Sequence, residues 1–445
     1  SGSREDRRAD GGGRRPCTVV MPSLWRSVRE GAWLAWAVVR CIAEDRLYLW
    51  VVARWRKIPL QVADLTPAAM SIFMDRRIDG VVADGEKARQ SEQCEIGAGG
   101  TGTARSWLRL STSSGADARV FVKLPASTFF ERVFLTVFGV YKNELGFYRA
   151  LRDDAALAKK LSAVSFAKAH AAEAVFGGRF VLVLEDLAER GAEFPTVASK
   201  HPRPRVEAVL RSLANLHAPF FGRPPPHVWT DASRPPFLRI ISDETLKNVL
   251  KRFPGLLPPL VLETYELFLA NYEAVRRHWS EGVLTLVHGD AHLGNMFFAN
   301  GAVGFYDLQC VAAEHPFRDV AYHLCSSCDS DDLALNEQHY VSYYVSQLNA
   351  AAGLQVLTFE AAWAAYRIHA LWACCAFVLC SGASELFESK MAKLTIRRIC
   401  AAMVRLDTRG ALDDVLAAQR AETAKDKGIE PPDVRAAGAE RGTIP

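Results

Sequence analysis

The sequence predicts an α+β protein in which strands dominate the first half and helices the second. Short apolar runs typical of strands, separated by glycine-rich or polar stretches, recur between residues 94 and 184. From Pro204 to Leu406 the apolar residues recur at helical spacing over longer segments. A hairpin pattern, residues 296–306, interrupts this helical part beside a cluster of polar residues.

Length and composition set the first limits. The 445 residues are enough for two or three domains, and 49% apolar residues can form a large core. A net charge of +4 is too small to indicate a nucleic-acid partner. The ten cysteines have no regular spacing, which favours reduced thiols and a cytoplasmic location. Cys325 and Cys328 form one C-x-x-C pair, which we interpret as packing because no second pair completes a zinc site.

The N-terminal 60 residues differ from the rest. Residues 1–20 have a composition typical of disordered or cloning-derived tails. Residues 21–60 are rich in tryptophan and predict one or two helices, but no apolar run reaches the roughly 20 residues that span a bilayer. Two interpretations stay open: the segment packs on the enzyme or on a second subunit, which we favour, or it lies on a membrane surface.

The first half begins with a helix and a glycine-rich turn. Leu65 to Ile78 predicts a short helix with Thr66 as N-cap and Pro67 in its first turn. A strand then leads into a turn in which backbone N–H groups could approach a phosphate, although such hairpins also occur without ligands. The glycines concerned are Gly97, Gly99 and Gly100.

Three further strands are predicted after the return strand, Arg105 to Leu110. Arg119 to Lys123 ends in a lysine where an unpaired charge would be costly, so Lys123 could hold nucleotide phosphates or could be an exposed charge at a strand end. A helical pattern around Glu144 follows. Val164 to Ala174 and Arg179 to Leu184 complete the predicted sheet.

The second half is predicted to be helical apart from the hairpin. Residues 246–279 have the pattern of two amphipathic helices broken around Pro254 to Pro259. From residue 420 the charged sequence, which contains Pro and Gly, predicts a mobile tail. The other predicted helices are Pro204 to Leu216, Leu335 to Leu348, Phe359 to Ser381 and Ser384 to Leu406.

The segment Leu284 to Gln309 concentrates the chemistry. An apolar run delivers His288-Gly289-Asp290 to a loop, and Asn295 follows. Asn300-Gly301 between apolar runs predicts a tight turn with positive φ at both residues, which brings Asp307 back beside Asn295.

Phosphoryl transfer needs this set of groups. A carboxylate must face the attacking hydroxyl, and oxygen ligands must hold Mg²⁺ against the phosphates. Protein kinases use H-R-D-x-x-x-x-N followed by a metal-binding Asp, and the same order occurs here with Gly289 in place of Arg. We therefore assign Asp290 to the hydroxyl, and Asn295 and Asp307 to Mg²⁺. The alternative is a polar turn before an ordinary hairpin.

Residues 288–295 resemble the HGDxHxxN signature of the aminoglycoside phosphotransferase and choline kinase-like family. Asp307-Leu308-Gln309 is similar to the second metal motif of that family, and its Gln resembles the ecdysteroid-kinase-like branch. Arg318 to Tyr322 resembles the segment whose Asp is usually structural. The resemblance covers roughly residues 60–410.

This resemblance implies a two-lobed protein-kinase-like fold, with a nucleotide-binding lobe at 61–187, a catalytic and substrate lobe at 188–419 and a tail at 420–445. It also implies that Glu144 pairs with Lys123 and that His217 is structural. His288 and His292 belong to the catalytic loop, His288 more as a brace than as a proton carrier. Backbone groups of the linker would meet the adenine ring; its residues are Glu185, Asp186 and Leu187.

The implied activity is transfer of the ATP γ-phosphate, with Mg²⁺, to a hydroxyl of a small molecule; GTP could replace ATP. Two alternatives stay open: a catalytically inactive nucleotide-binding or scaffold protein of the same fold, and a membrane-surface protein that uses its Trp-rich segment. We expect no nucleic-acid partner. The substrate and the oligomeric state are left open, because fold does not determine them.

Overall fold

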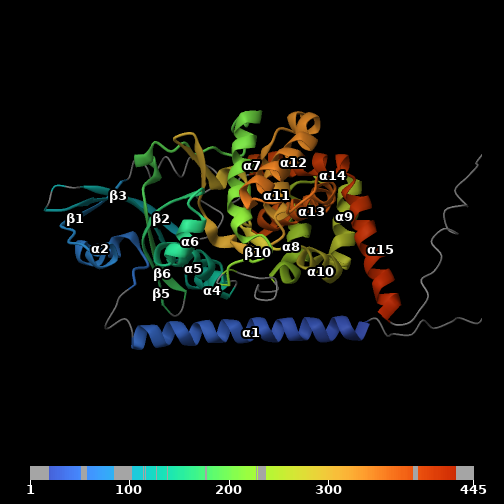
Figure 1. Cartoon of the computed structure of the whole chain (residues 1–445). Coiled ribbons are helices and arrows are strands. Elements are labelled where there is room, and N and C mark those ends of the chain that lie inside the picture. Colours follow the sequence, from blue (N-terminus) through green and yellow to red (C-terminus); the bar gives the residue numbers. More distant parts are fainter. Residues whose placement is uncertain are drawn as a thin grey trace, which may run out of the picture.

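A computed structural model of the chain describes residues 20–51, 58–84, 103–113, 115, 117–126, 128–137, 139–175, 178–226, 228, 237–383 and 389–426. It consists of a lobe built on an antiparallel sheet and a larger, mainly helical lobe (Figure 1). The predicted α+β, two-lobed fold is confirmed. The glycine-rich turn with Gly97, Gly99 and Gly100 lies outside the described residues, as do residues 1–19 and 427–445.

The N-terminal lobe is organised around five antiparallel strands in the order β1-β2-β3-β6-β5. On β3, Lys123 lies opposite Arg105 of β2 and Leu182 of β6, so these three side chains share one face of the sheet. The strands are β1 (Gly80–Ala83), β2 (Ala104–Ser111), β3 (Ala118–Leu124), β5 (Ala169–Val175) and β6 (Arg179–Glu185).

Helices cover both faces of this sheet. On one face Val120 and Val122 pack with Met70 and Phe73 of α2 (Pro67–Met74) in a separate core. Thr66 caps α2 as predicted, since its hydroxyl accepts from the Ala69 N–H at 3.3 Å. On the opposite face lies α5, followed by α6; α4 precedes α5. Their bounds are α4 (Phe129–Val137), α5 (Val140–Asp153) and α6 (Ala155–Lys160).

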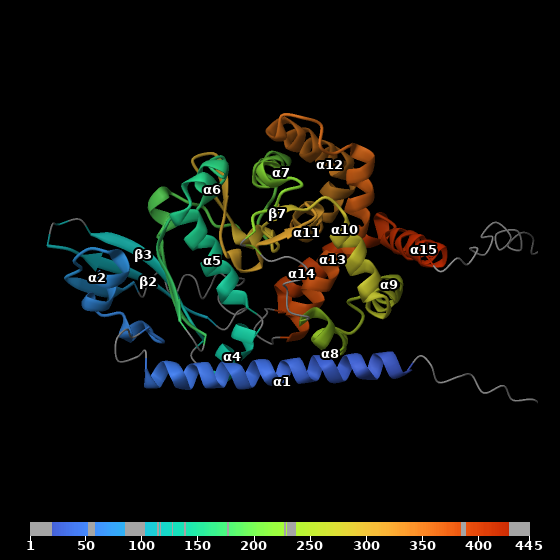
Figure 2. The same ribbon diagram turned by 60° about the horizontal axis from the view of Figure 1, so that its bottom comes forward.

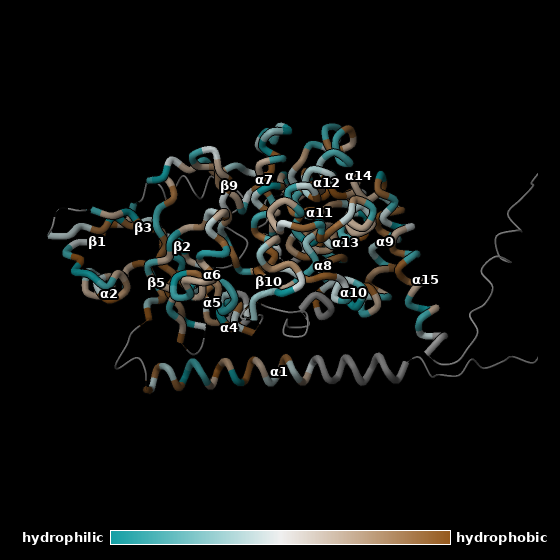
Figure 3. The backbone as a smooth tube through the Cα atoms, in the orientation of Figure 1, coloured by the Kyte–Doolittle hydropathy of each residue, from teal (hydrophilic) through white to brown (hydrophobic). Residues whose placement is uncertain are grey.

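The Trp-rich segment forms one long helix, α1 (Val20–Trp50), along one edge of the molecule (Figures 1 and 2). Its inner face packs on α4, and Asp45 pairs with the buried Arg179 at 3.0 Å. The described part of α1 contains hydrophobic turns (Figure 3). Its side chains are not all buried, since Trp36 is 58% and Trp50 is 75% exposed. Packing of this segment on the rest of the protein is thus confirmed for one face, and membrane association stays a prediction.

The C-terminal lobe contains more helix than predicted. Residues 246–279 belong to three helices, because Asn271 ends α9 and α10 begins directly after it. A helix that was not predicted, α15, runs to Asp426, into the expected tail; it buries Leu412 and Leu416, while its other faces are charged. The helices are α7 (Arg203–His217), α8 (Phe237–Arg252), α9 (Pro259–Ala270), α10 (Tyr272–Glu281), α11 (Phe317–Ser327), α12 (Ser330–Ala352), α13 (Phe359–Ala383), α14 (Ser389–Arg405) and α15 (Thr408–Asp426).

Helix α13 lies at the centre of this lobe. Its segment Phe359–Gly382 is as long and apolar as a membrane-spanning helix, but 72% of its most apolar window is buried within the protein. Buried residues of α13, among them Tyr366, Leu371 and Cys375, belong to the main hydrophobic core. This packing is typical of the core helix of a globular lobe.

Two further small sheets, one of three strands and one of two, complete the strands of the structure. The hairpin β8 (Met296–Ala299) and β9 (Ala302–Phe305) turns at Asn300 and Gly301, with φ of 52° and 74°, as the sequence predicted. β4 (Ser165–Phe166) extends the hairpin in parallel to β9. The two-stranded sheet pairs β7 (Thr285–Val287) with β10 (Ala312–Glu314).

Candidate active site

One buried carboxylate forms hydrogen bonds with the backbone of the loop after β7. Asp319 of α11 is fully buried and accepts hydrogen bonds from the backbone N–H groups of His288, at 2.6 Å, and Gly289, at 2.8 Å. The His217 Nε2 atom lies 3.1 Å from the same carboxylate, and its Nδ1 lies 2.7 Å from the Tyr344 hydroxyl. The loop backbone is therefore fixed by side chains of α7, α11 and α12.

Gly289 is required in this loop for two reasons. Its φ is +81°, and a Cβ there would lie 2.1 Å from the Cys310 carbonyl oxygen. We expect Gly289→Ala to lower the free energy of unfolding by more than the ~1–3 kcal/mol of an unfavourable backbone conformation alone, because a backbone atom must also move.

Gly301→Ala is the matched control, since Gly301 has φ of +74° but open space around its Cβ position. Thermal unfolding of both variants measures the difference. Equal losses of stability would contradict the steric argument.

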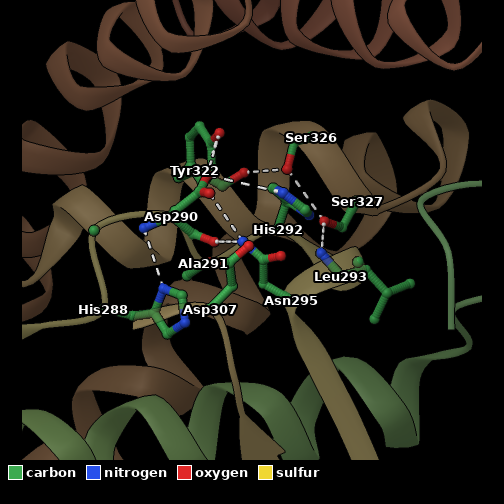
Figure 4. Close-up of polar contacts among 12 residues, drawn as sticks. His288, Asp290, Ala291, His292, Leu293, Asn295, Asp307, Tyr322, Ser326 and Ser327 are labelled. Carbon is green, nitrogen blue, oxygen red and sulfur yellow. Dashed lines mark hydrogen bonds and ion pairs between the residues drawn. The ribbon is translucent and has the colours of Figure 1, made fainter. Parts of the chain in front are cut away.

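Asp290 follows Gly289 in this loop, and both of its carboxylate oxygens accept hydrogen bonds (Figure 4). The Tyr322 hydroxyl donates to Oδ1 at 2.8 Å, and the Asn295 Nδ2 donates to Oδ2 at 2.9 Å. Asn295 Nδ2 also donates to the Asp290 carbonyl at 2.9 Å. Because the nitrogen of Asn295 faces Asp290, its Oδ1 is the side-chain atom that could ligate a metal ion.

The two loop histidines differ in their environment. The His288 Nε2–H donates to the Tyr306 carbonyl at 3.0 Å, and its Nδ1 accepts from the Asp290 N–H at 3.2 Å, so both nitrogens stabilise the loop. The His292 Nε2 lies 3.8 Å from Asp290 Oδ1, and burial lowers the pKa of His292. Its ring also packs against Tyr322 and Phe377.

Asp307 follows β9 in the left-handed conformation, with φ of 57°. The hairpin brings it close to the loop, since the Tyr306 N–H donates to the Asn295 carbonyl at 3.1 Å. Its carboxylate pairs with Lys123 at 2.9 Å and with Arg105 at 3.6 Å. Burial alone would raise the pKa of Asp307, but these two cations outweigh it and hold the pKa at about 2.

Lys123 is shared by two carboxylates. Its Nζ lies 2.8 Å from Glu144 of α5, so the Lys123–Glu144 ion pair implied by the resemblance is present. Burial would lower the pKa of Lys123, but Asp307 and Glu144 raise it, and the ammonium stays charged at neutral pH. The preceding residue on α5, Asn143, donates to the carbonyls of Gln309 and Val311 at 3.0 and 2.7 Å, which links α5 to the segment after Asp307.

The predicted linker residues lie where β6 leaves the sheet. The Glu185 side chain accepts from the Lys168 N–H at 2.7 Å and pairs with Arg190. Asp186 caps the short helix η3 (Leu187–Arg190) through the Ala188 N–H. These side chains are thus engaged within the protein, and adenine contacts of the linker backbone stay a prediction.

The sequence of this chain also matches a known protein family. The family model described as "Ecdysteroid kinase-like family" matches residues 107–357, more than half of the chain, from β2 to the segment after α12. The chain belongs to the ecdysteroid kinase-like family. None of the curated proteins matches it.

Three solved structures with similar folds are distant in sequence from this ecdysteroid kinase-like protein. An ethanolamine kinase from Plasmodium vivax is 14% identical, with a TM-score of 0.41, over 69% of this chain and 81% of that chain. An aminoglycoside phosphotransferase from Alicyclobacillus acidocaldarius is 12% identical, with a TM-score of 0.41, over 81% and 98%. An AMP-bound spectinomycin phosphotransferase is 12% identical, with a TM-score of 0.39, over 77% and 98%.

The structure of this ecdysteroid kinase-like protein adds two residues that the sequence analysis did not assign to the site. Arg105 reaches Asp307 from β2, and Tyr322 reaches Asp290 from α11. Arg105 could have been found from its register opposite Lys123, which pairing of the two predicted strands implies. No local pattern indicates Tyr322, because its contact joins segments that are distant in sequence.

Proposed function

We propose that this chain transfers the γ-phosphoryl group of ATP to a hydroxyl group of a small molecule, in the cytoplasm, with GTP as the alternative donor. One observation carries the proposal: Lys123 of the sheet lobe meets Asp307 of the helical lobe, beside a loop in which Asp290 and Asn295 are hydrogen-bonded to each other. Membership of a family of small-molecule kinases supports the same reaction class.

The donor set of the site fits a magnesium ion. Asp307, with its low pKa, and Asn295 Oδ1 are oxygen ligands of the kind that Mg²⁺ prefers. These two residues would hold the ion, and the ion would neutralise charge on the phosphates. Lys123, positioned by Glu144, would bind the α and β phosphates.

Asp290 would act on the acceptor. Its carboxylate would orient the hydroxyl group and accept its proton as the hydroxyl oxygen bonds to the γ-phosphorus and the bond to the β,γ-bridging oxygen breaks, releasing ADP. Tyr322 and Asn295 fix the orientation of this carboxylate, which is the positioning that dominates catalysis of phosphoryl transfer.

A screen of hydroxylated small molecules tests the proposal. Nucleotide consumption is measured for amino sugars, amino alcohols, sterols and hydroxylated acyl compounds, with ATP and with GTP. We expect acceptor-dependent release of nucleoside diphosphate from wild type and none from Asp290→Asn. Nucleotide binding without turnover of any acceptor would instead favour the scaffold alternative.

A further inference from the structure

Directly behind the catalytic loop, two histidines and a cysteine face one another. His201 precedes α7, His323 lies on α11, and Cys328 ends α11. Their His nitrogen and Cys sulfur atoms all lie within 4.8 Å of one another. The His201 and His323 Nε2 atoms are 3.0 Å apart, with the rings nearly perpendicular at 86°. None of these residues is used by the proposed phosphoryl transfer.

We propose that His201, His323 and Cys328 form a binding site for one Zn²⁺ ion. Imidazole nitrogen and thiolate sulfur are the ligands that Zn²⁺ prefers, and sets of Cys and His from separate segments are typical of zinc sites. His201 is partly exposed, so an ion and a fourth ligand, water, can reach the cluster from the surface.

The hydrogen bonds around the histidines suit metal ligation. His323 Nδ1 lies 3.2 Å from the Ala291 carbonyl, which can only accept, so its Nδ1 carries the proton and its Nε2 presents a lone pair to the cluster. In the structure the His201 Nε2–H therefore donates to the His323 Nε2 at 3.0 Å. The His201 Nδ1 has no hydrogen-bond partner in the described part of the chain, so it can take up this proton. Binding of Zn²⁺ would replace the hydrogen bond between the rings and leave the His201 Nε2 as the second lone-pair donor.

The protonation states agree with this arrangement. Burial lowers the pKa of His201 to about 4 and that of His323 well below its usual value, so both rings are neutral at pH 7. Burial and the neighbouring Asp332 raise the pKa of the Cys328 thiol, and Arg398 opposes them only in part, so the thiol carries its proton when no metal ion is bound. Binding of Zn²⁺ would form the S–Zn bond and release the thiol proton to solvent.

The cysteine pair that the sequence analysis assigned to packing is divided between two environments. The Cys325 Sγ lies 3.8 Å from the Tyr366 hydroxyl, inside the core, whereas Cys328 faces the histidines. Cys325 therefore provides a matched control on the same helix. A zinc ion at Cys328 would also link the segment before α7 to α11, whose His323 supports Ala291, the neighbour of Asp290.

Cobalt substitution tests the site in the full chain. Zn²⁺ is removed with a chelator, Co²⁺ is added, and the thiolate-to-cobalt charge-transfer absorption is recorded for wild type, Cys328→Ser and Cys325→Ser. Zinc affinity is measured by competition with a chromogenic chelator. We expect one ion per chain, the absorption band in wild type and Cys325→Ser but not in Cys328→Ser, and an affinity loss of at least about 100-fold in Cys328→Ser.

Three results would contradict the proposed zinc site. Absence of the band in wild type, or the same zinc affinity in wild type and Cys328→Ser, would mean that the two histidines form only a hydrogen bond. If Cys328→Ser does not fold, His201→Gln at the partly exposed position decides: it should weaken zinc binding, and unchanged affinity would overturn the proposal.

Discussion

Asp290→Asn is expected to lower the rate of phosphoryl transfer by about 10²–10⁴-fold, the usual contribution of a positioned general base. The amide is isosteric but cannot accept the hydroxyl proton. Its carbonyl oxygen can still accept from Asn295 Nδ2, and its NH₂ group can donate to the Tyr322 hydroxyl oxygen, which reverses the direction of that hydrogen bond. Steady-state kinetics with an acceptor identified by the screen, together with the nucleotide dissociation constant, measure the effect.

The kinetic pattern distinguishes catalysis from folding. Nucleotide affinity and melting temperature should stay close to those of wild type, while kcat falls. Asp413→Asn, an exposed carboxylate on α15, is the control and should leave kcat unchanged. If Asp290→Asn keeps more than a tenth of the wild-type kcat, Asp290 is not the general base.

Asp319→Ala is expected to lower the free energy of unfolding by about 3–5 kcal/mol. It would leave the buried N–H groups of His288 and Gly289 without acceptors and remove the partner of the His217 Nε2 atom. Urea denaturation followed by tryptophan fluorescence at pH 7 measures the loss. Asp413→Ala, with an exposed carboxylate, is the control and should change stability by less than about 1 kcal/mol.

The stabilisation by Asp319 also has a predictable pH dependence. Burial alone would raise the pKa of Asp319, but the hydrogen bonds from His217 and Gly289 lower it below its usual value. A depressed pKa in the folded state means that the stabilisation is complete above the unfolded value, near 3.9, and is lost as the pH falls through the folded value. The difference in the free energy of unfolding between wild type and Asp319→Ala should therefore become smaller only below about pH 4.

Sequence reasoning succeeded where short-range patterns determine the geometry. The Asn300-Gly301 pair requires positive φ in a tight hairpin, and this alone returns the chain from Asn295 to Asp307. A lysine at the end of an apolar strand needs a buried counter-charge, and Glu144 supplies it.

The contacts that sequence reasoning missed depend on packing between distant segments. Tyr322 reaches Asp290 only because Asp319 fixes α11 against the loop. The spacing of apolar residues in the sequence does not predict this contact. Helix α15 was not predicted because its sequence is largely charged. A single row of buried apolar residues is nevertheless enough to pack it on the lobe. Cys325 and Cys328 share a motif, but the helix turns them toward different neighbours.

The central claim is a metal–nucleotide centre that joins the two lobes, and a thermal shift measurement tests it most directly. Melting temperatures are recorded with ATP and with GTP, each with and without Mg²⁺, for wild type, Asp307→Ala and the exposed control Asp331→Ala. Ligand at about 100 times its Kd should stabilise wild type and the control by about 2.7 kcal/mol. We predict a Mg²⁺-dependent shift that disappears in Asp307→Ala; no shift with either nucleotide in wild type, or an equal shift in Asp307→Ala, would contradict the claim.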